Sequence, residues 1–166
     1  LGAYGNFVNR SLSFIRKYWN GVVPDGRFDT EIYLAIERLY QTTGTLIEKG
    51  AIKDAVNGIF EFVRWANRYF DAQTPWITRI SDQDACQNTL YQCVQIAANL
   101  AVLLKPFLPF SSEKICDWLD VDEGWQIHEV PGRHVLPEIR ILFERIDKSV
   151  ITAESEKLNE LFVKKQ

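Results

Sequence analysis

The sequence of 166 residues contains no methionine, only two histidines and three cysteines, and these shortages exclude several kinds of site. Cys86, Cys93 and Cys116 are odd in number and lack the spacing of metal ligands, so neither a disulfide framework nor a zinc site is expected. His128 and His134 stand in a stretch without a nucleophile or metal-ligand arrangement. We therefore predict no catalytic residue and no metal site in this chain.

Long apolar runs and an excess of positive charge are also lacking. The longest apolar candidate, residues 96–104, is interrupted by Asn99 and is much shorter than the roughly 20 residues that cross a bilayer. The net charge of −3 and the pI near 5.5 exclude a protein that coats nucleic acid through many phosphate contacts. Any contact with RNA must therefore be local. The use of unpaired cysteines predicts a cytoplasmic protein.

The sequence does contain the composition of one globular domain. Apolar residues make up 46% and charged residues 25%, which is close to the average of folded proteins and excludes disorder. A chain of this length buries a core without disulfides or metals. Because Leu1 already lies inside a helical pattern and no signal-like leader precedes it, we expect a segment of a longer protein.

Apolar residues recur at helical spacing along most of the chain. The pattern predicts helices over about residues 2–19, from a cap at Asp29 or Thr30 to Gly50, over about residues 51–72 and 82–105, and from Ser111 or Ser112 to Leu119. The third helix is apolar over more than one face, so we expect it to be central, and Pro75 ends it.

The remainder of the chain is less regular. Residues 120–141 lose the helical period and are expected to be irregular with at most a brief strand, whereas residues 142–166 return to it. Short connections between long helices favour antiparallel neighbours, so the predicted fold is an all-α bundle of five or six mostly antiparallel helices. We assign residues 1–146 to the bundle and residues 147–166 to a C-terminal helical extension of the same domain.

Two places in the sequence carry side chains suited to an unpaired nucleotide. Asn6 and Arg10 are one turn apart on the first predicted helix, and Ser13 and Lys17 continue the same polar stripe. Trp76 follows a helix-ending proline, where chains usually meet solvent. A guanidinium can hydrogen-bond a base edge, and an indole can stack on a base. The indole could equally fold back and cover the bundle.

Four blocks of sequence, in order and with matching spacing, carry a family resemblance. They are Gly5-Asn6-Phe7-Val8-Asn9-Arg10 followed by Ser13-Phe14-Ile15, then Asn67-Arg68-Tyr69-Phe70-Asp71 followed by Pro75-Trp76, then Leu104-Lys105-Pro106-Phe107-Leu108-Pro109, and more weakly Gly132-Arg133-His134-Val135 leading to Leu142-Phe143-Glu144-Arg145-Ile146. Together they resemble the anticodon-binding domain of the methionyl-tRNA synthetases, which are class I aminoacyl-tRNA synthetases. The resemblance covers about residues 1–146.

The resemblance implies a helical bundle that holds the splayed anticodon CAU of initiator and elongator methionine tRNAs. It implies that Asn6 and Arg10 hydrogen-bond the edges of anticodon bases, chiefly the first-position cytosine, and that Trp76 stacks on that cytosine. It also implies a parent enzyme, a methionine–tRNA ligase, that joins methionine to its tRNA using ATP, and whose catalytic domain is a partner of this segment.

The signatures of that catalytic half are absent from the sequence. The histidine-rich adenylate-binding signature, the Lys-Met-Ser-Lys-Ser type loop and a zinc knuckle are all lacking. We therefore expect this segment to have no catalytic site and no cofactor, because ATP and methionine would bind the rest of the parent. Neither a membrane nor DNA is expected among its partners.

Two other functions fit parts of the same pattern. A helical protein-interaction or scaffold domain without RNA binding could use Asn6, Arg10 and Trp76 on a protein partner, because tryptophan and arginine are also enriched in protein hot spots. A class I synthetase for isoleucine, valine, leucine or cysteine is a further alternative. The spacing of Asn6 and Arg10 together with Pro75-Trp76 favours methionine over these.

Overall fold

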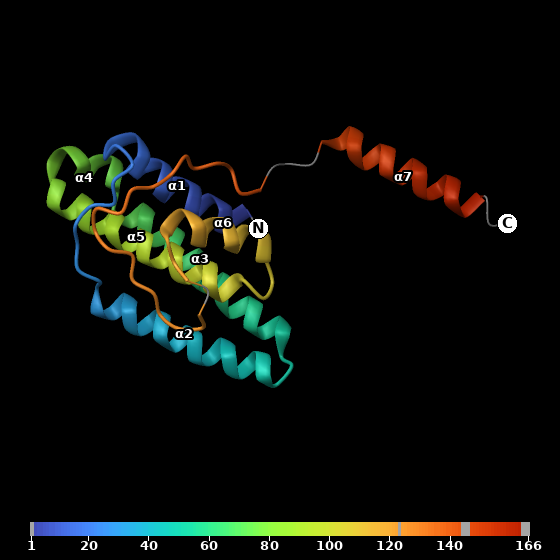
Figure 1. Cartoon of the computed structure of the whole chain (residues 1–166), viewed down its shortest axis with the longest axis horizontal. Coiled ribbons are helices and arrows are strands. Elements are labelled where there is room, and N and C mark those ends of the chain that lie inside the picture. Colours follow the sequence, from blue (N-terminus) through green and yellow to red (C-terminus); the bar gives the residue numbers. More distant parts are fainter. Residues whose placement is uncertain (1, 123, 144–146, 164–166) are drawn as a thin grey trace.

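The computed structural model describes residues 2–122, 124–143 and 147–163, and these residues form an all-helical fold. The helices are α1 (Gly2–Tyr18), α2 (Thr30–Glu48), α3 (Ile52–Ala72), α4 (Pro75–Ser81), α5 (Gln83–Leu104), α6 (Pro109–Leu119) and α7 (Lys148–Val163). The first six gather in one bundle, whereas α7 extends away from it (Figure 1). The predicted all-α class is confirmed, and none of the described helices is long and apolar enough to cross a membrane.

The centre of the bundle is α5. Every side chain of residues 89–104 is buried, and α5 packs against α1, α2, α3, α4 and α6. Helix α3 packs against α1, α2 and α5 but leaves charged side chains such as Glu61 and Arg64 in solvent. The prediction that the third helix is central was therefore wrong. It failed because α5 carries polar residues at positions that the fold buries.

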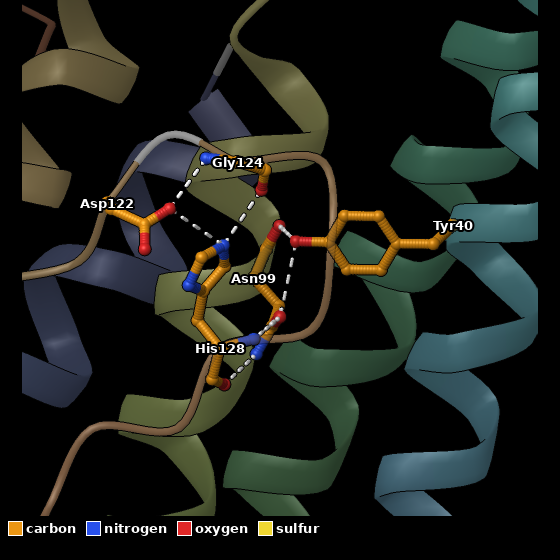
Figure 2. A network of polar contacts seen from close by, with 5 residues as sticks. All are labelled: Tyr40, Asn99, Asp122, Gly124 and His128. Atoms are coloured by element: carbon orange, nitrogen blue, oxygen red, sulfur yellow. Dashed lines mark hydrogen bonds and ion pairs between the residues drawn. The ribbon is translucent and has the colours of Figure 1, made fainter.

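Two of these polar residues bind an extended segment in the way that a neighbouring strand would. Gln95 accepts a hydrogen bond from the N–H of Val130 at 2.8 Å and donates to its carbonyl oxygen at 2.9 Å. Asn99 accepts from the N–H of His128 at 2.9 Å and donates to its carbonyl oxygen at 2.8 Å (Figure 2). The Tyr40 hydroxyl of α2 donates to the Asn99 side chain at 3.2 Å. Side-chain amides thus satisfy backbone groups that would otherwise be buried without partners.

Most helix ends agree with the predictions. Asp29 caps α2, since its carboxylate accepts from the N–H groups of the next turn at 2.8 and 3.1 Å. Helix α6 begins at Pro109 rather than after Ser111 or Ser112, because a proline at the first helical position leaves no N–H that needs an acceptor. The short helix α4 was not expected from the sequence.

The last third of the chain also follows the prediction in part. The stretch between α6 and α7 is irregular among its described residues, with one isolated antiparallel bridge between Val22 and Val135. Of the helix expected over residues 142–166, only α7 is helical in the described part, and Phe143 instead lies 6.3 Å from the Tyr4 ring, centroid to centroid. Residues 144–146 and 164–166 lie outside the described residues. The division at residue 146 stays a prediction.

Candidate nucleic-acid interface

Asn6 and Arg10 project from α1 toward α3, as their spacing predicts. The Asn6 side-chain amide donates to the side-chain oxygen of Asn67 at 2.9 Å. One turn further, the Arg10 guanidinium donates to the Asp71 carboxylate at 2.6 Å. Asn67 and Asp71 are themselves one turn apart on α3, so the two pairs form successive cross-links between the helices. Asn67 also donates to the carbonyl oxygen of Ala3 at 3.0 Å, which fixes the start of α1.

Phe70 connects Arg10 with Trp76. The guanidinium carbon of Arg10 lies 4.6 Å from the centroid of the Phe70 ring. The Trp76 ring lies 6.2 Å from the same ring, centroid to centroid, at an interplanar angle of 43°. Phe70 is only 3% exposed, whereas Trp76 is 43% exposed. The indole therefore meets solvent beside Arg10 and is not folded into the core.

These side chains line one groove of about 300 Å³. Its lining residues are Arg10, Ser13, Phe14, Lys17, Tyr18, Phe70 and Trp76. The structure thus brings two of the three predicted site residues together. The third, Asn6, lines a separate hollow of about 200 Å³ that also includes Phe143. Asn6 therefore lies next to the groove, toward the start of α1, and not in it.

The backbone before α4 determines where Trp76 lies. Thr74 adopts the left-handed conformation with φ +43°, which only a minority of non-glycine residues do, and this reverses the chain after α3. Pro75 then begins α4 and is buried, and its carbonyl oxygen accepts from the Cys86 thiol at 3.4 Å. Trp76 is consequently the second residue of a helix that packs on α5, and not part of an open loop.

The histidine rings contact backbone carbonyl oxygens, and the cysteines are buried. A ring nitrogen of His128 lies 2.8 Å from the carbonyl oxygen of Gly124 (Figure 2), and a ring nitrogen of His134 lies 2.8 Å from that of Trp118. All three cysteines are buried free thiols. Burial raises the pKa of Cys93 to about 12, which keeps this thiol protonated and unreactive. Among the described residues, no group of three His, Cys, Asp or Glu side chains could hold a metal ion.

Sequence reasoning missed several residues of the groove. Asp71 and Phe70 belong to a block that carried the resemblance, yet neither had a role until the structure placed them against Arg10. The signal was present, since Asn67 and Asp71 repeat the one-turn spacing of the residues that they bind. Tyr18 had no comparable signal, because an aromatic residue on an amphipathic helix usually reads as core.

Comparisons with known proteins concern the family and fold of the chain as a whole. A family model described as the anticodon-binding domain of tRNA ligase matches residues 29–160, so it includes Trp76 but begins after α1. Methionine–tRNA ligases of Bacillus anthracis (strain CDC 684 / NRRL 3495) and Bacillus cereus (strain Q1) are 49% and 48% identical over 160 residues. Each alignment covers 95% of this chain and 29% of the relative, so the chain spans less than a third of their length.

A solved structure shows the same arrangement of helices. The free-state crystal structure of the Mycobacterium tuberculosis methionyl-tRNA synthetase matches with a TM-score of 0.78 and 27% identity. The match covers 87% of this chain and 32% of that chain. The resemblance to methionyl-tRNA synthetases drawn from the four blocks is thereby confirmed. This chain belongs to the family of the anticodon-binding domains of tRNA ligases.

Proposed function

We propose that this chain is the anticodon-binding region of a methionine–tRNA ligase and that it holds the anticodon CAU of initiator and elongator methionine tRNAs. The observation that carries this proposal is the groove in which a guanidinium and a partly exposed indole contact the same buried ring. The similarity to methionine–tRNA ligases supports the choice of amino acid. As a whole, the parent would join methionine to its tRNA using ATP.

The three site residues have separate tasks in this proposal. Trp76 stacks on the first-position cytosine, and Arg10 donates hydrogen bonds to the edge of the same base. A guanidinium has five N–H donors, so the bond to Asp71 leaves several of them for a base. Asn6 lies outside the groove, and we therefore assign it to the edge of the base that lies toward the start of α1.

This mode of binding agrees with the acidic chain. Stacking and directed hydrogen bonds do not need many phosphate contacts, so a net charge of −3 is compatible with them. The segment itself would bind neither ATP nor methionine, since its sequence lacks the signatures of the catalytic half. That half would be its partner within the parent. Buried free thiols support a place in the cytoplasm.

The test compares two RNA stem-loops, one with the CAU anticodon and one that differs only at its cytosine. We expect the 166-residue chain to bind the CAU loop more tightly, by on the order of 1–3 kcal/mol. Trp76→Ala and Arg10→Ala should each lower the affinity for the CAU loop by a similar amount. The readout is the fluorescence anisotropy of labelled RNA, with circular dichroism to show that each variant is folded.

Trp125→Ala is the matched control, because Trp125 is as exposed as Trp76, at 43%, and packs on Tyr40 away from the groove. It should leave the affinity for the CAU loop unchanged. Equal affinities for the two loops would contradict the proposal, and so would a Trp76→Ala variant that binds as the wild type does. A folded chain that binds neither loop would favour a protein-interaction domain.

A further inference from the structure

The groove carries a second cluster of side chains at the C-terminal end of α1. Tyr18 of α1 lies beside two cations, with Lys17 Nζ at 5.0 Å and the guanidinium carbon of Arg79 at 4.4 Å from its ring centroid. Lys17 belongs to α1 and Arg79 to α4, so the Tyr18 ring contacts cations from two helices. Tyr18 is 39% exposed, and the cluster therefore faces solvent.

Neither cation has a carboxylate partner in the part of the chain that the structure describes. Among the described residues, the ion pairs include Arg10 with Asp71 but none that involves Lys17 or Arg79. The Nε of Arg79 is buried and has no hydrogen-bond partner in the described part of the chain. Contact with the ring compensates two neighbouring like charges only partly. Two such charges with open donor capacity suit an anion.

The cluster is continuous with the proposed base-binding end. Lys17 and Tyr18 line the same groove as Arg10 and Trp76. Lys17 follows Arg10 by about two helical turns, which separates the two ends by roughly 10 Å along α1. A strand with one base between Arg10 and Trp76 must continue along the groove or leave it. The anion that such a strand carries at every nucleotide is phosphate.

We propose that Lys17 and Arg79, held against Tyr18, bind a backbone phosphate of the RNA strand whose base occupies the groove between Arg10 and Trp76. This site rests on the proposed function and adds a second contact to it. The Tyr18 ring is engaged by the two cations, so its task is to position them and not to stack on a base. Contacts to phosphate position a nucleic acid without reading its sequence.

The test is the salt dependence of binding to the two stem-loops. The slope of log K against log salt is negative, and removal of one phosphate contact to a single strand should reduce its magnitude by about 0.7. We expect Lys17→Gln/Arg79→Gln to show this lower slope and to lose roughly tenfold in affinity at low salt. The loss should be the same for the CAU loop and the changed loop, so their affinity ratio stays as in the wild type.

The matched control removes the same charge elsewhere. Lys49 and Lys53 are exposed near the turn between α2 and α3, which Figure 1 shows at the end of the bundle remote from α4. Lys49→Gln/Lys53→Gln should leave slope and affinity unchanged. Lys17→Gln alone, at an exposed position, gives a smaller reduction in slope and serves if the double variant does not fold.

The possible results separate this site from the proposed function. The phosphate site is overturned if the groove variant keeps the wild-type slope and affinity, if it alters the ratio between the two loops, or if the control loses as much. The anticodon proposal fails if the wild type does not distinguish the loops, yet a lower slope in the groove variant would then still support the phosphate site. A folded wild type that binds neither loop overturns both.

Discussion

Asn99→Ala is expected to cost more stability than an ordinary polar-to-alanine change. In the folded chain this side chain, which is 1% exposed, completes the hydrogen bonding of the His128 N–H and carbonyl groups and of the Tyr40 hydroxyl. Alanine leaves these three buried groups without that partner. Each such loss costs about 1–3 kcal/mol. The Tyr40 hydroxyl keeps a longer contact of 3.4 Å to the Asn99 carbonyl oxygen, which reduces the loss of stability at that hydroxyl.

We therefore expect Asn99→Ala to lower the free energy of unfolding by about 3–5 kcal/mol. In a domain of this size the melting temperature would fall by roughly 10 °C. Urea denaturation followed by far-ultraviolet circular dichroism measures the first quantity, and the slope against urea concentration should stay as in the wild type. Asn88→Ala is the control, because Asn88 is an exposed residue of the same helix that accepts a single bond from Gln92.

A loss below about 1 kcal/mol for Asn99→Ala would refute this reasoning. It would show that water or a shift of the chain restores the partners of His128 and Tyr40, and that the amide is not what fixes the extended segment against α5. A loss of the same size in Asn88→Ala would refute it too, because the effect would then come from helix α5 in general.

Three further predictions concern the groove, the packing and the titration of the fold. Asp71→Asn should change the free energy of unfolding by less than about 1 kcal/mol, because its ion pair with Arg10 is exposed. It should nevertheless lower the ratio of affinities for the two stem-loops, since the Arg10 guanidinium is no longer held in place. An unchanged ratio would contradict this. Gly26→Ala should destabilise the chain by about 1–3 kcal/mol in urea denaturation, because its new methyl group would overlap the ring of Tyr91; a neutral effect would show that the loop yields. Burial raises the pKa of Cys93 to about 12, so above pH 9 the unfolded chain releases this proton and the folded chain keeps it. Through this thiol alone, stability should therefore fall by up to about 1.4 kcal/mol per pH unit above pH 9, and Cys93→Ala should reduce the overall slope by that amount in denaturation curves measured from pH 8 to 11.

The parts of the fold that depend on local sequence were predictable. The ends of α1, α2, α3 and α5 follow from apolar periodicity, and the cap of α2 follows from the type and place of Asp29. Helix α4 escaped because seven residues are too few to show a period. The central place of α5 escaped because Gln95 and Asn99 look solvent-exposed until their partners, about 30 residues further along the chain, are known.

The candidate site was likewise predictable only where it depends on local sequence. The common side of Asn6 and Arg10 is a property of one helix and could be read from their spacing. Their partners on α3 lie 61 residues further on, so only the tertiary structure pairs them. Gly5 is similar, because it stood in the first block of the resemblance without a role. In the structure an added Cβ at Gly5 would lie 2.8 Å from the Phe143 ring, so the absence of a side chain permits this contact.

The distribution of charge in the groove assigns different work to its two ends. At the Trp76 end, Asp71 offsets the charge of Arg10, so binding there depends on stacking and on the direction of hydrogen bonds, which salt screens little. At the Tyr18 end, Lys17 and Arg79 have no such counter-charge among the described residues, so binding there depends on salt. An acidic chain can thus select an anticodon at one end and hold its backbone at the other. Variants of the first end should change the ratio between loops at every salt concentration, and variants of the second should change the salt slope and the affinity for both loops but not that ratio.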